Sequence, residues 1–218
     1  MNYKKVTFKS ILFCVILLLC TLSFSQSNDA SLKHIDKLAL KMFTDMNNRD
    51  YDAILEMTHP KVFEMAPKES IKEVFKGLFE GNEEFSMDIP KIVPAYKLSK
   101  IFKIEKDHLE YAFVTYDMRM KMSFLKQEFD DASKEMMKTM MEPQGMEVTF
   151  ISNKTLDIVM NNRITIILKD DTTNNKWVMV NYDPDSPLFY NIVPTSLIES
   201  AKSYKQDLML ESKKNNED

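Results

Sequence analysis

The stretch EYAFVTYDMRMKMSF, residues 110–124, alternates apolar and polar side chains along most of its length. One row consists of Ala112, Val114, Tyr116, Met118, Met120, Met122 and Phe124, and the other of Thr115, Asp117, Arg119, Lys121 and Ser123. Successive side chains of a β-strand point to opposite faces of the sheet. The stretch therefore predicts a long antiparallel strand with one buried and one solvent-facing side.

Other segments on both sides of this stretch have weaker strand patterns. They cover residues 97–103, 147–151, 156–169 and 176–182, and the third is expected to break at Asn161-Asn162. The segment DDTTNNK, residues 170–176, predicts a hairpin turn between the last two strands. These segments together predict an antiparallel sheet in the second half of the chain.

Helical periodicity dominates the first half of the chain. Apolar residues recur at helical spacing from Leu32 to Met46, a short helix follows Asp50, and a third helix runs from Pro67 to Gly81. Helices followed by antiparallel strands predict a single α+β domain over residues 26–205, with the N-terminal helices packed on the sheet. Helical spacing returns at about 126–145, which predicts a helical insert, and the charged residues 206–218 predict a disordered tail.

The first 25 residues have the layout of a secretory signal peptide. Lys4, Lys5 and Lys9 precede an apolar stretch at 11–22, and Ser23 and Ser25 predict cleavage between Ser25 and Gln26. We therefore expect an exported protein, periplasmic or secreted, with no membrane association after cleavage. The alternatives are an uncleaved anchor, for which the apolar stretch falls short of the roughly 20 residues needed, and a lipoprotein modified at Cys20.

Composition excludes several classes of function. Both cysteines, Cys14 and Cys20, lie in the predicted signal peptide, so the mature chain forms no disulfide and has no thiol nucleophile. The formal net charge is −4 with only three arginines, which argues against a nucleic-acid partner. Three glycines cannot assemble a phosphate-binding loop, and we expect no cofactor.

The order of segments resembles the nuclear transport factor 2-like superfamily. The resemblance covers about residues 30–185 and rests on RDYDAILEMTHP, PKESIKEVFKGLFEG and the strand KWVMVNYD. It implies a curved antiparallel sheet wrapped around helices in a cone with an internal pocket. The superfamily contains isomerases, polyketide cyclases and dehydratases as well as non-catalytic binding and assembly modules, so the fold does not select a function.

The expected pocket residues come from two strands. Tyr116, Met118 and Met120 form the inward row of the long strand, and the last strand adds Trp177, Met179 and Asn181. This set suits an uncharged, mostly apolar ligand that Tyr116 or Asn181 orients. Burial of about 200 Å² of apolar surface contributes on the order of 5 kcal/mol before association costs.

No catalytic residue or metal ligand can be assigned from spacing. His59 precedes Pro60 and is either a general base or, as we prefer, a residue that ends a helix. Three scattered histidines give no zinc pattern. The many methionines are interpreted as packing residues; monovalent copper binding and a flexible apolar pocket are the alternatives.

These observations favour an exported, non-catalytic domain that binds a small apolar ligand or a protein partner. One alternative is a cofactor-free isomerase, cyclase or dehydratase that uses the same pocket. The other is a structural module that forms a homodimer through the outer face of the sheet. The presence of a carboxylate or histidine beside a second polar group inside the cavity would distinguish the enzyme from the binder.

Overall fold

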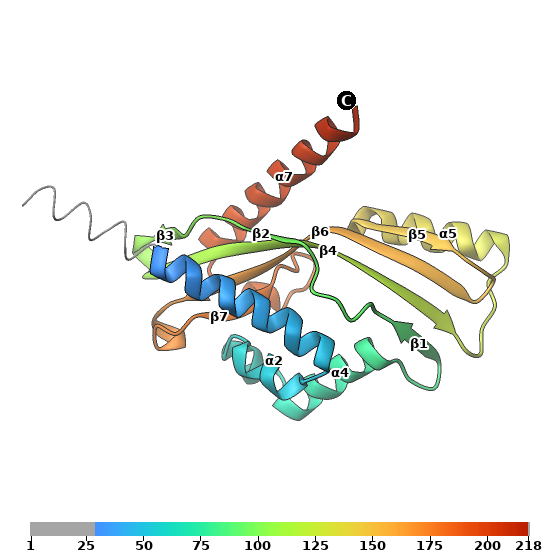
Figure 1. Ribbon diagram of the computed structural model, residues 1–218, viewed down its shortest axis with the longest axis horizontal. Coiled ribbons are helices and arrows are strands. Elements are labelled where there is room, and N and C mark those ends of the chain that lie inside the picture. The colour runs from blue at the N-terminus through green and yellow to red at the C-terminus, as the bar shows by residue number, and fades with distance from the viewer. Residues whose placement is uncertain (1–28, 218) are drawn as a thin grey trace, which may run out of the picture.

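The computed structural model describes residues 29–217 and contains an antiparallel seven-stranded sheet with helices packed against it (Figure 1). A first helix occupies residues 29–48 and is followed by α2 (Tyr51–Met57), α3 (Lys61–Met65) and α4 (Lys68–Glu80). The strands β1 (Phe85–Asp88), β2 (Tyr96–Leu98) and β3 (Phe102–Ile104) come next. The predicted α+β class, with N-terminal helices packed on a curved antiparallel sheet, is confirmed.

Two long central strands organise the sheet. They are β4 (Leu109–Phe124) and β6 (Thr155–Lys169), which pair with each other along almost their whole length. β1, β2 and β3 pair with β4, whereas β5 (Met146–Phe150) and β7 (Val178–Asn181) pair with β6. Each long strand is thus flanked on its outer edge by short strands that follow one another along it. The predicted hairpin turn joins β6 to β7 and contains a 3-10 helix, Asp171–Thr173.

A β-bulge divides the β4–β6 ribbon into two halves. Tyr116 pairs with Arg163 and Met118 pairs with Met160, so β6 contains one extra residue at this point. Asn162 has a φ of 53°, in the left-handed region that asparagine tolerates better than most residues. Bulges increase the local twist of a ribbon, and the paired strands β4 and β6 overlap in the view of Figure 1 in this region. The predicted break at Asn161-Asn162 is therefore a bulge within one continuous strand.

In the proximal half, residues 109–116 of β4 with 163–169 of β6, both faces of the ribbon are buried. Ala112 and Val114 pack against the first helix, and Phe113 packs on the opposite face against the C-terminal helices. The prediction of one solvent-facing side is therefore wrong for this half. The reason is a second helical layer, α6 (Phe189–Ile192) and α7 (Thr195–Glu217), which covers the outer face.

Helix α7 also corrects the predicted C-terminal tail. Residues from 206 onward, expected to be disordered, continue this helix as far as Glu217. Its first turns are anchored by Leu197 and Ala201, which are fully buried, and the helix crosses the ribbon as far as Ser212, whose hydroxyl accepts a hydrogen bond from the Asn162 side chain. The last turns project past the ribbon (Figure 1). A helix that is already nucleated by packing adds further residues at low cost, and the charged C-terminal segment does not interrupt it.

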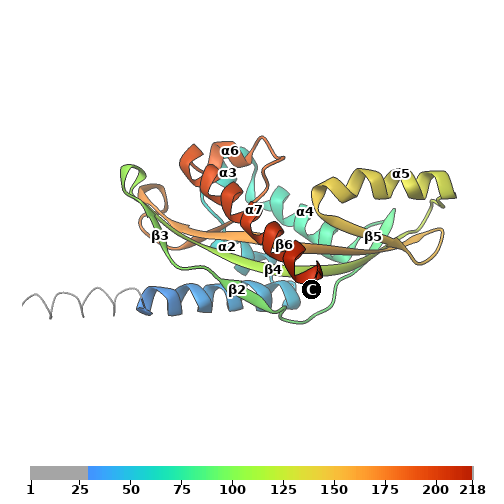
Figure 2. The same ribbon diagram turned by 90° about the horizontal axis from the view of Figure 1, so that it is seen from above.

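In the distal half, residues 118–124 of β4 with 155–160 of β6 and β5, only one face is covered. The predicted helical insert forms α5 (Asp131–Met141) and a short 3-10 helix, Glu142–Gln144. Met137 and Met141 of α5 pack on the strand row around Ile158. Figure 2 shows α5 and the first helix on opposite sides of the sheet. The same row of β4 side chains packs on the first helix in the proximal half and on α5 in the distal half. The twist of the ribbon turns this row from one side to the other along the strand.

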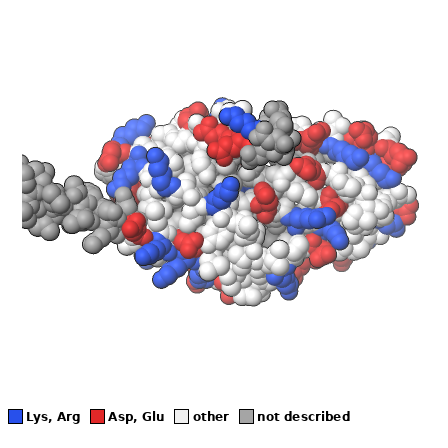
Figure 3. Space-filling view, turned by 45° about the horizontal axis from the view of Figure 1, so that its top comes forward, with Lys and Arg blue, Asp and Glu red and all other residues white. Residues whose placement is uncertain are grey.

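The predicted signal peptide, residues 1–25 with its cleavage site before Gln26, lies outside the described residues. Within residues 29–217, no helix is both long enough and apolar enough to cross a membrane. The face shown in Figure 3 mixes basic and acidic side chains rather than separating them into patches.

Candidate functional site

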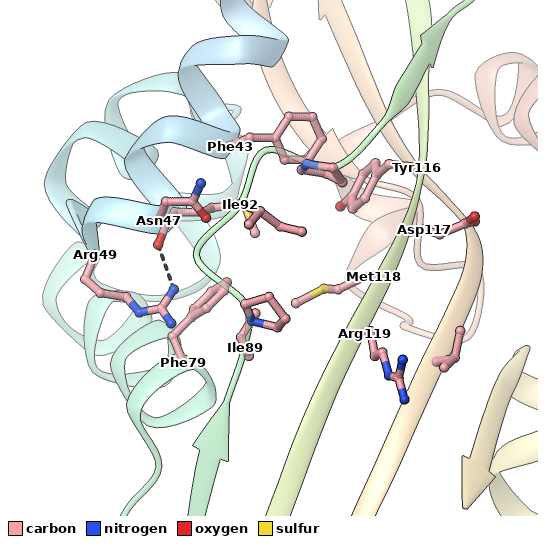
Figure 4. Close-up of a pocket in the computed structure, with 14 residues that line it drawn as sticks. Phe43, Asn47, Arg49, Phe79, Ile89, Ile92, Tyr116, Asp117, Met118 and Arg119 are labelled. Carbon is pink, nitrogen blue, oxygen red and sulfur yellow. Dashed lines mark hydrogen bonds between the residues drawn. The ribbon is translucent and has the colours of Figure 1, made fainter.

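A cavity of about 180 Å³ lies beside residues 116–119 of β4, where the two halves of the ribbon meet (Figure 4). The end of the first helix, α4, the 89–95 segment and β4 enclose it. Its lining residues are Phe43, Met46, Asn47, Arg49, Phe79, Ile89, Pro90, Ile92, Pro94, Tyr116, Asp117, Met118, Arg119 and Val159. A cavity of this size holds a six-membered ring or a short alkyl chain.

The cavity exists because one edge of β4 is interrupted. β1 pairs with residues 121–124 of β4 and β2 pairs with residues 114–116, so no strand pairs with residues 117–120 on this edge. The connecting segment contains Pro90 and Pro94. Proline has no N–H to donate to a neighbouring strand, so the segment leaves the sheet and forms one wall of the cavity.

Backbone polar groups of β4 face this gap. On the same edge, the Ser99 N–H donates to the Phe113 carbonyl and the Phe113 N–H donates to the Ser99 hydroxyl. Every second residue of an antiparallel strand directs its N–H and C=O the same way. Asp117 and Arg119 are the corresponding residues beside the cavity. Among the described residues, no hydrogen bond uses their backbone groups on this edge. They are therefore available to water or to a ligand.

The walls of the cavity are largely apolar. Phe43 packs edge-on against Tyr116, with ring centroids 4.9 Å apart. Met118 touches the apolar clusters of both halves. The Tyr116 hydroxyl is 3.4 Å from the hydroxyl of Thr165, which donates to the side-chain oxygen of Asn181 at 3.1 Å. This chain of hydrogen bonds fixes the Tyr116 ring at the inner wall.

The charged side chains of β4 at the cavity are committed elsewhere. The Asp117 carboxylate accepts a hydrogen bond from the Asn162 backbone N–H at 2.8 Å, and Figure 4 shows this side chain pointing away from the cavity. Arg119 forms a two-pronged ion pair with Asp157 and thereby lowers the pKa of that carboxyl. Among the described lining residues, the cavity therefore contains no carboxylate or histidine beside a second polar group.

Arg49 is positioned by the end of the first helix. The N–H of Asp50 donates to the carbonyl of Asp45 and the N–H of Arg49 to that of Met46, which together form a Schellman motif. Arg49 occupies its left-handed position with a φ of 59°. Glycine is usual at this position, and another residue costs about 1 kcal/mol. The guanidinium donates to the Met46 carbonyl at 2.7 Å and lies 5.1 Å from the centroid of the Phe79 ring.

The predicted pocket residues are divided among several environments. Tyr116 and Met118 line the cavity. Met120 packs in the distal cluster, Met179 is buried beneath the first helix, Trp177 lies at the edge of that core, and Asn181 is exposed and bonded to Thr165. The structure thus brings two of the six into one cavity and places the other four in packing or hydrogen-bonding roles around it.

The remaining cavity residues were not identified from the sequence. Most of them come from the end of the first helix, from α4 and from the segment DIPKIVPAY, residues 88–96; Asp117, Arg119 and Val159 belong to the central strands. Two prolines in this apolar segment indicate an interrupted edge strand, and this signal could have located one wall. Nothing in the sequence indicates that the end of the first helix forms the opposite wall, because that contact is between residues far apart in the chain.

His59 lies away from the cavity and is fully buried. Its backbone N–H donates to the Met179 carbonyl at 2.9 Å, and its Nδ1 accepts from the Lys61 N–H at 3.2 Å. Nε2 has no hydrogen-bond partner in the described chain, and burial lowers the pKa of the ring. His59 therefore joins the α2–α3 corner to β7 as a neutral side chain, with no polar partner that would let it act as a base.

The methionines of α5 fall into two groups. Met137 and Met141 pack against the distal strands, as predicted for packing residues, whereas Met136 and Met140 are each 65% exposed. No group of three His, Cys, Asp or Glu residues within the described chain is arranged to hold a metal ion.

Comparisons of the chain with protein-family models, with curated proteins and with solved structures found no match, and the cavity is therefore the basis for assigning a function.

Proposed function

We propose that the protein is an exported, non-catalytic domain that binds a small, mostly apolar ligand in the cavity beside Tyr116 and Met118. The observation that carries the proposal is an apolar cavity of about 180 Å³ at a gap in the sheet edge. Its walls supply burial, and the unpaired backbone groups of Asp117 and Arg119 supply a few directional hydrogen bonds. Ligand sites commonly combine these two features.

The arrangement supports binding over catalysis. General acid–base catalysis needs a titratable group within hydrogen-bonding reach of the reacting atom. The carboxylate of Asp117 points out of the cavity, and His59 does not line it. An isomerase or dehydratase of the superfamily that the sequence resembles would need such a group inside the cavity.

The homodimer alternative receives less support from the outer face of the sheet. In the proximal half, α7 covers this face, and Phe113 lies beneath it. In the distal half, the uncovered face carries the exposed ion pair of Arg119 with Asp157. A stable homodimer interface is normally more apolar than this.

A pair of matched variants tests the binding proposal. Met118 and Met120 are both half-buried and belong to the same alternating row of β4, but only Met118 lines the cavity. Calorimetric titration of the purified protein with octanol should show binding that Met118→Ala weakens about tenfold, since a methionine wall contributes roughly 1–2 kcal/mol of contact. Met120→Ala should leave the octanol affinity unchanged.

Thermal unfolding of both variants separates binding from packing. Comparable small losses of stability, with octanol binding reduced only in Met118→Ala, support the cavity as a ligand site. A loss of several kcal/mol in Met118→Ala, with no octanol bound by the unmodified protein, would overturn the proposal and favour a structural role.

A further inference from the structure

Arg49 is the residue of the cavity wall that the fold alone explains least. The Schellman motif at the end of the first helix requires a left-handed residue, and glycine would satisfy it without strain. An arginine is present instead, and its side chain reaches along the cavity wall to the Phe79 ring (Figure 4). Strained backbone positions of this kind often occur at functional sites.

Arg49 forms no ion pair with a carboxylate among the described residues. Arg119, the other arginine at the cavity, is neutralised by Asp157, whereas no described carboxylate lies within ion-pair distance of Arg49. One of its five N–H donors bonds to the Met46 carbonyl, and the guanidinium lies over the Phe79 ring. These two contacts hold the planar group in place and leave donors for a bidentate partner.

From this arrangement we infer that the natural ligand is a small organic carboxylate. Its apolar body occupies the cavity between Tyr116 and Met118, and its carboxylate accepts hydrogen bonds from the Arg49 guanidinium. The inference rests on the proposed binding function and replaces the uncharged ligand expected from the strand residues alone. The chain has a formal net charge of −4, so its overall charge does not attract an anion. Recognition of the carboxylate therefore depends on the Arg49 guanidinium.

Two probes with the same alkyl chain separate the two proposals. The purified protein is titrated by calorimetry at neutral pH with octanoate and with octanol. Octanoate is expected to bind at least tenfold more tightly, because a hydrogen bond to a charged group is stronger than one to a neutral group. If octanol binds and octanoate binds no more tightly, the carboxylate inference fails while the binding proposal stands; if neither binds, both fail.

Substitutions at Arg49 identify the group that recognises the anion. Arg49→Gln and Arg49→Gly should each remove the advantage of octanoate over octanol, and Arg49→Lys should retain part of it. Arg49→Gly also relieves the left-handed backbone, so its melting temperature should not fall, which excludes unfolding as the cause. Arg163→Gln removes the same charge outside the cavity lining and should leave the octanoate affinity unchanged. Equal octanoate binding by Arg49→Gly and the unmodified protein would overturn the inference.

Discussion

The two halves of the β4–β6 ribbon use the same strands but different side chains and different degrees of burial. In the proximal half, Ala112, Val114 and Ile166 are fully buried between two helical layers. In the distal half, the methionines of β4 are only partly buried, and a single helix covers one face. Branched and aromatic side chains pack in few arrangements, whereas methionine adapts to several. The proximal half therefore stabilises one structure, and the distal half can adjust without unfolding it.

The cavity lies at the boundary between these halves. Met118 touches the apolar clusters of both, and the bulge at Asn162 separates their registers. On the opposite edge of the ribbon, the amino group of Lys205 donates to the carbonyls of Asn161 and Asn162. At this boundary, Lys205 of α7 therefore covers one edge of the ribbon, whereas no strand pairs with residues 117–120 on the other edge.

The largest expected loss of stability follows from a substitution in the proximal half of the ribbon. Phe113 is 1% exposed and stacks on Tyr204 with ring centroids 4.4 Å apart. Phe113→Ala should lower the free energy of unfolding by about 3–5 kcal/mol, because it leaves a cavity between two packed layers. Phe124→Ala removes the same atoms from a partly buried site in the distal half and should cost less than half as much. Urea denaturation measures both, and equal losses would contradict the distinction between the halves.

An intermediate effect is expected at the closed edge of the bulge. Lys205 donates to the carbonyl of Asn162 at 2.7 Å, and burial lowers the pKa of its amino group. Lys205→Met keeps most of the side-chain length but leaves these carbonyls unpaired, which should cost about 1–3 kcal/mol. In this variant, amide hydrogen exchange should become faster around the bulge, with a smaller change in the proximal half of the ribbon. Lys202→Met, on the exposed side of α7, provides the control and should change neither measurement.

The stability of the protein should also depend on pH through His59, which lies at the α2–α3 corner. Its pKa in the folded protein is lowered by burial, so near pH 6 the unfolded chain binds a proton that the folded protein does not. Stability should therefore fall as the pH decreases below about 6.5 and stop falling below the folded-state pKa. Asp170 and Glu64 oppose this shift, and Lys61 adds to it.

The matched test at this corner is His59→Asn. Its side-chain oxygen can replace Nδ1 as the acceptor for the Lys61 N–H, and it does not titrate. The slope of unfolding free energy against pH in this range should flatten in His59→Asn and persist in His34→Asn, which alters an exposed histidine. An unchanged slope in His59→Asn would show that His59 is not the group responsible.

The smallest effect is expected on the exposed side of α5. Met136→Gln and Met140→Gln should change stability by no more than about 0.5 kcal/mol, since both side chains are mostly in solvent. Met137→Gln and Met141→Gln place an amide against the distal strands and should cost more. Thermal unfolding of the four variants measures these losses. Equal losses of stability for the exposed pair and the packed pair would contradict the orientation of α5 described above.

Local pattern predicted much of this fold because each signal depends on neighbouring residues. The alternation in residues 110–124 predicted β4, the short helix expected after Asp50 is α2, and Asn161-Asn162 marked the bulge. In the predicted pocket row of β4, Tyr116 and Met118 line the cavity and Met120 does not. Met120 has the same periodicity as Met118, but the twist of the ribbon turns it toward α5 instead of the cavity.

The sequence by itself determined the α+β class and the long central strand at 110–124, because composition and period depend on the chain alone. Only the tertiary structure decided that α7 covers the outer face, that the sheet edge opens beside Asp117, and that Arg49 meets Phe79 there. Those features join segments about 30 to 90 residues apart, and no local pattern specifies which distant surfaces will pack together. The candidate site is built almost entirely from such contacts, and this is why its key residue became visible only in the folded chain.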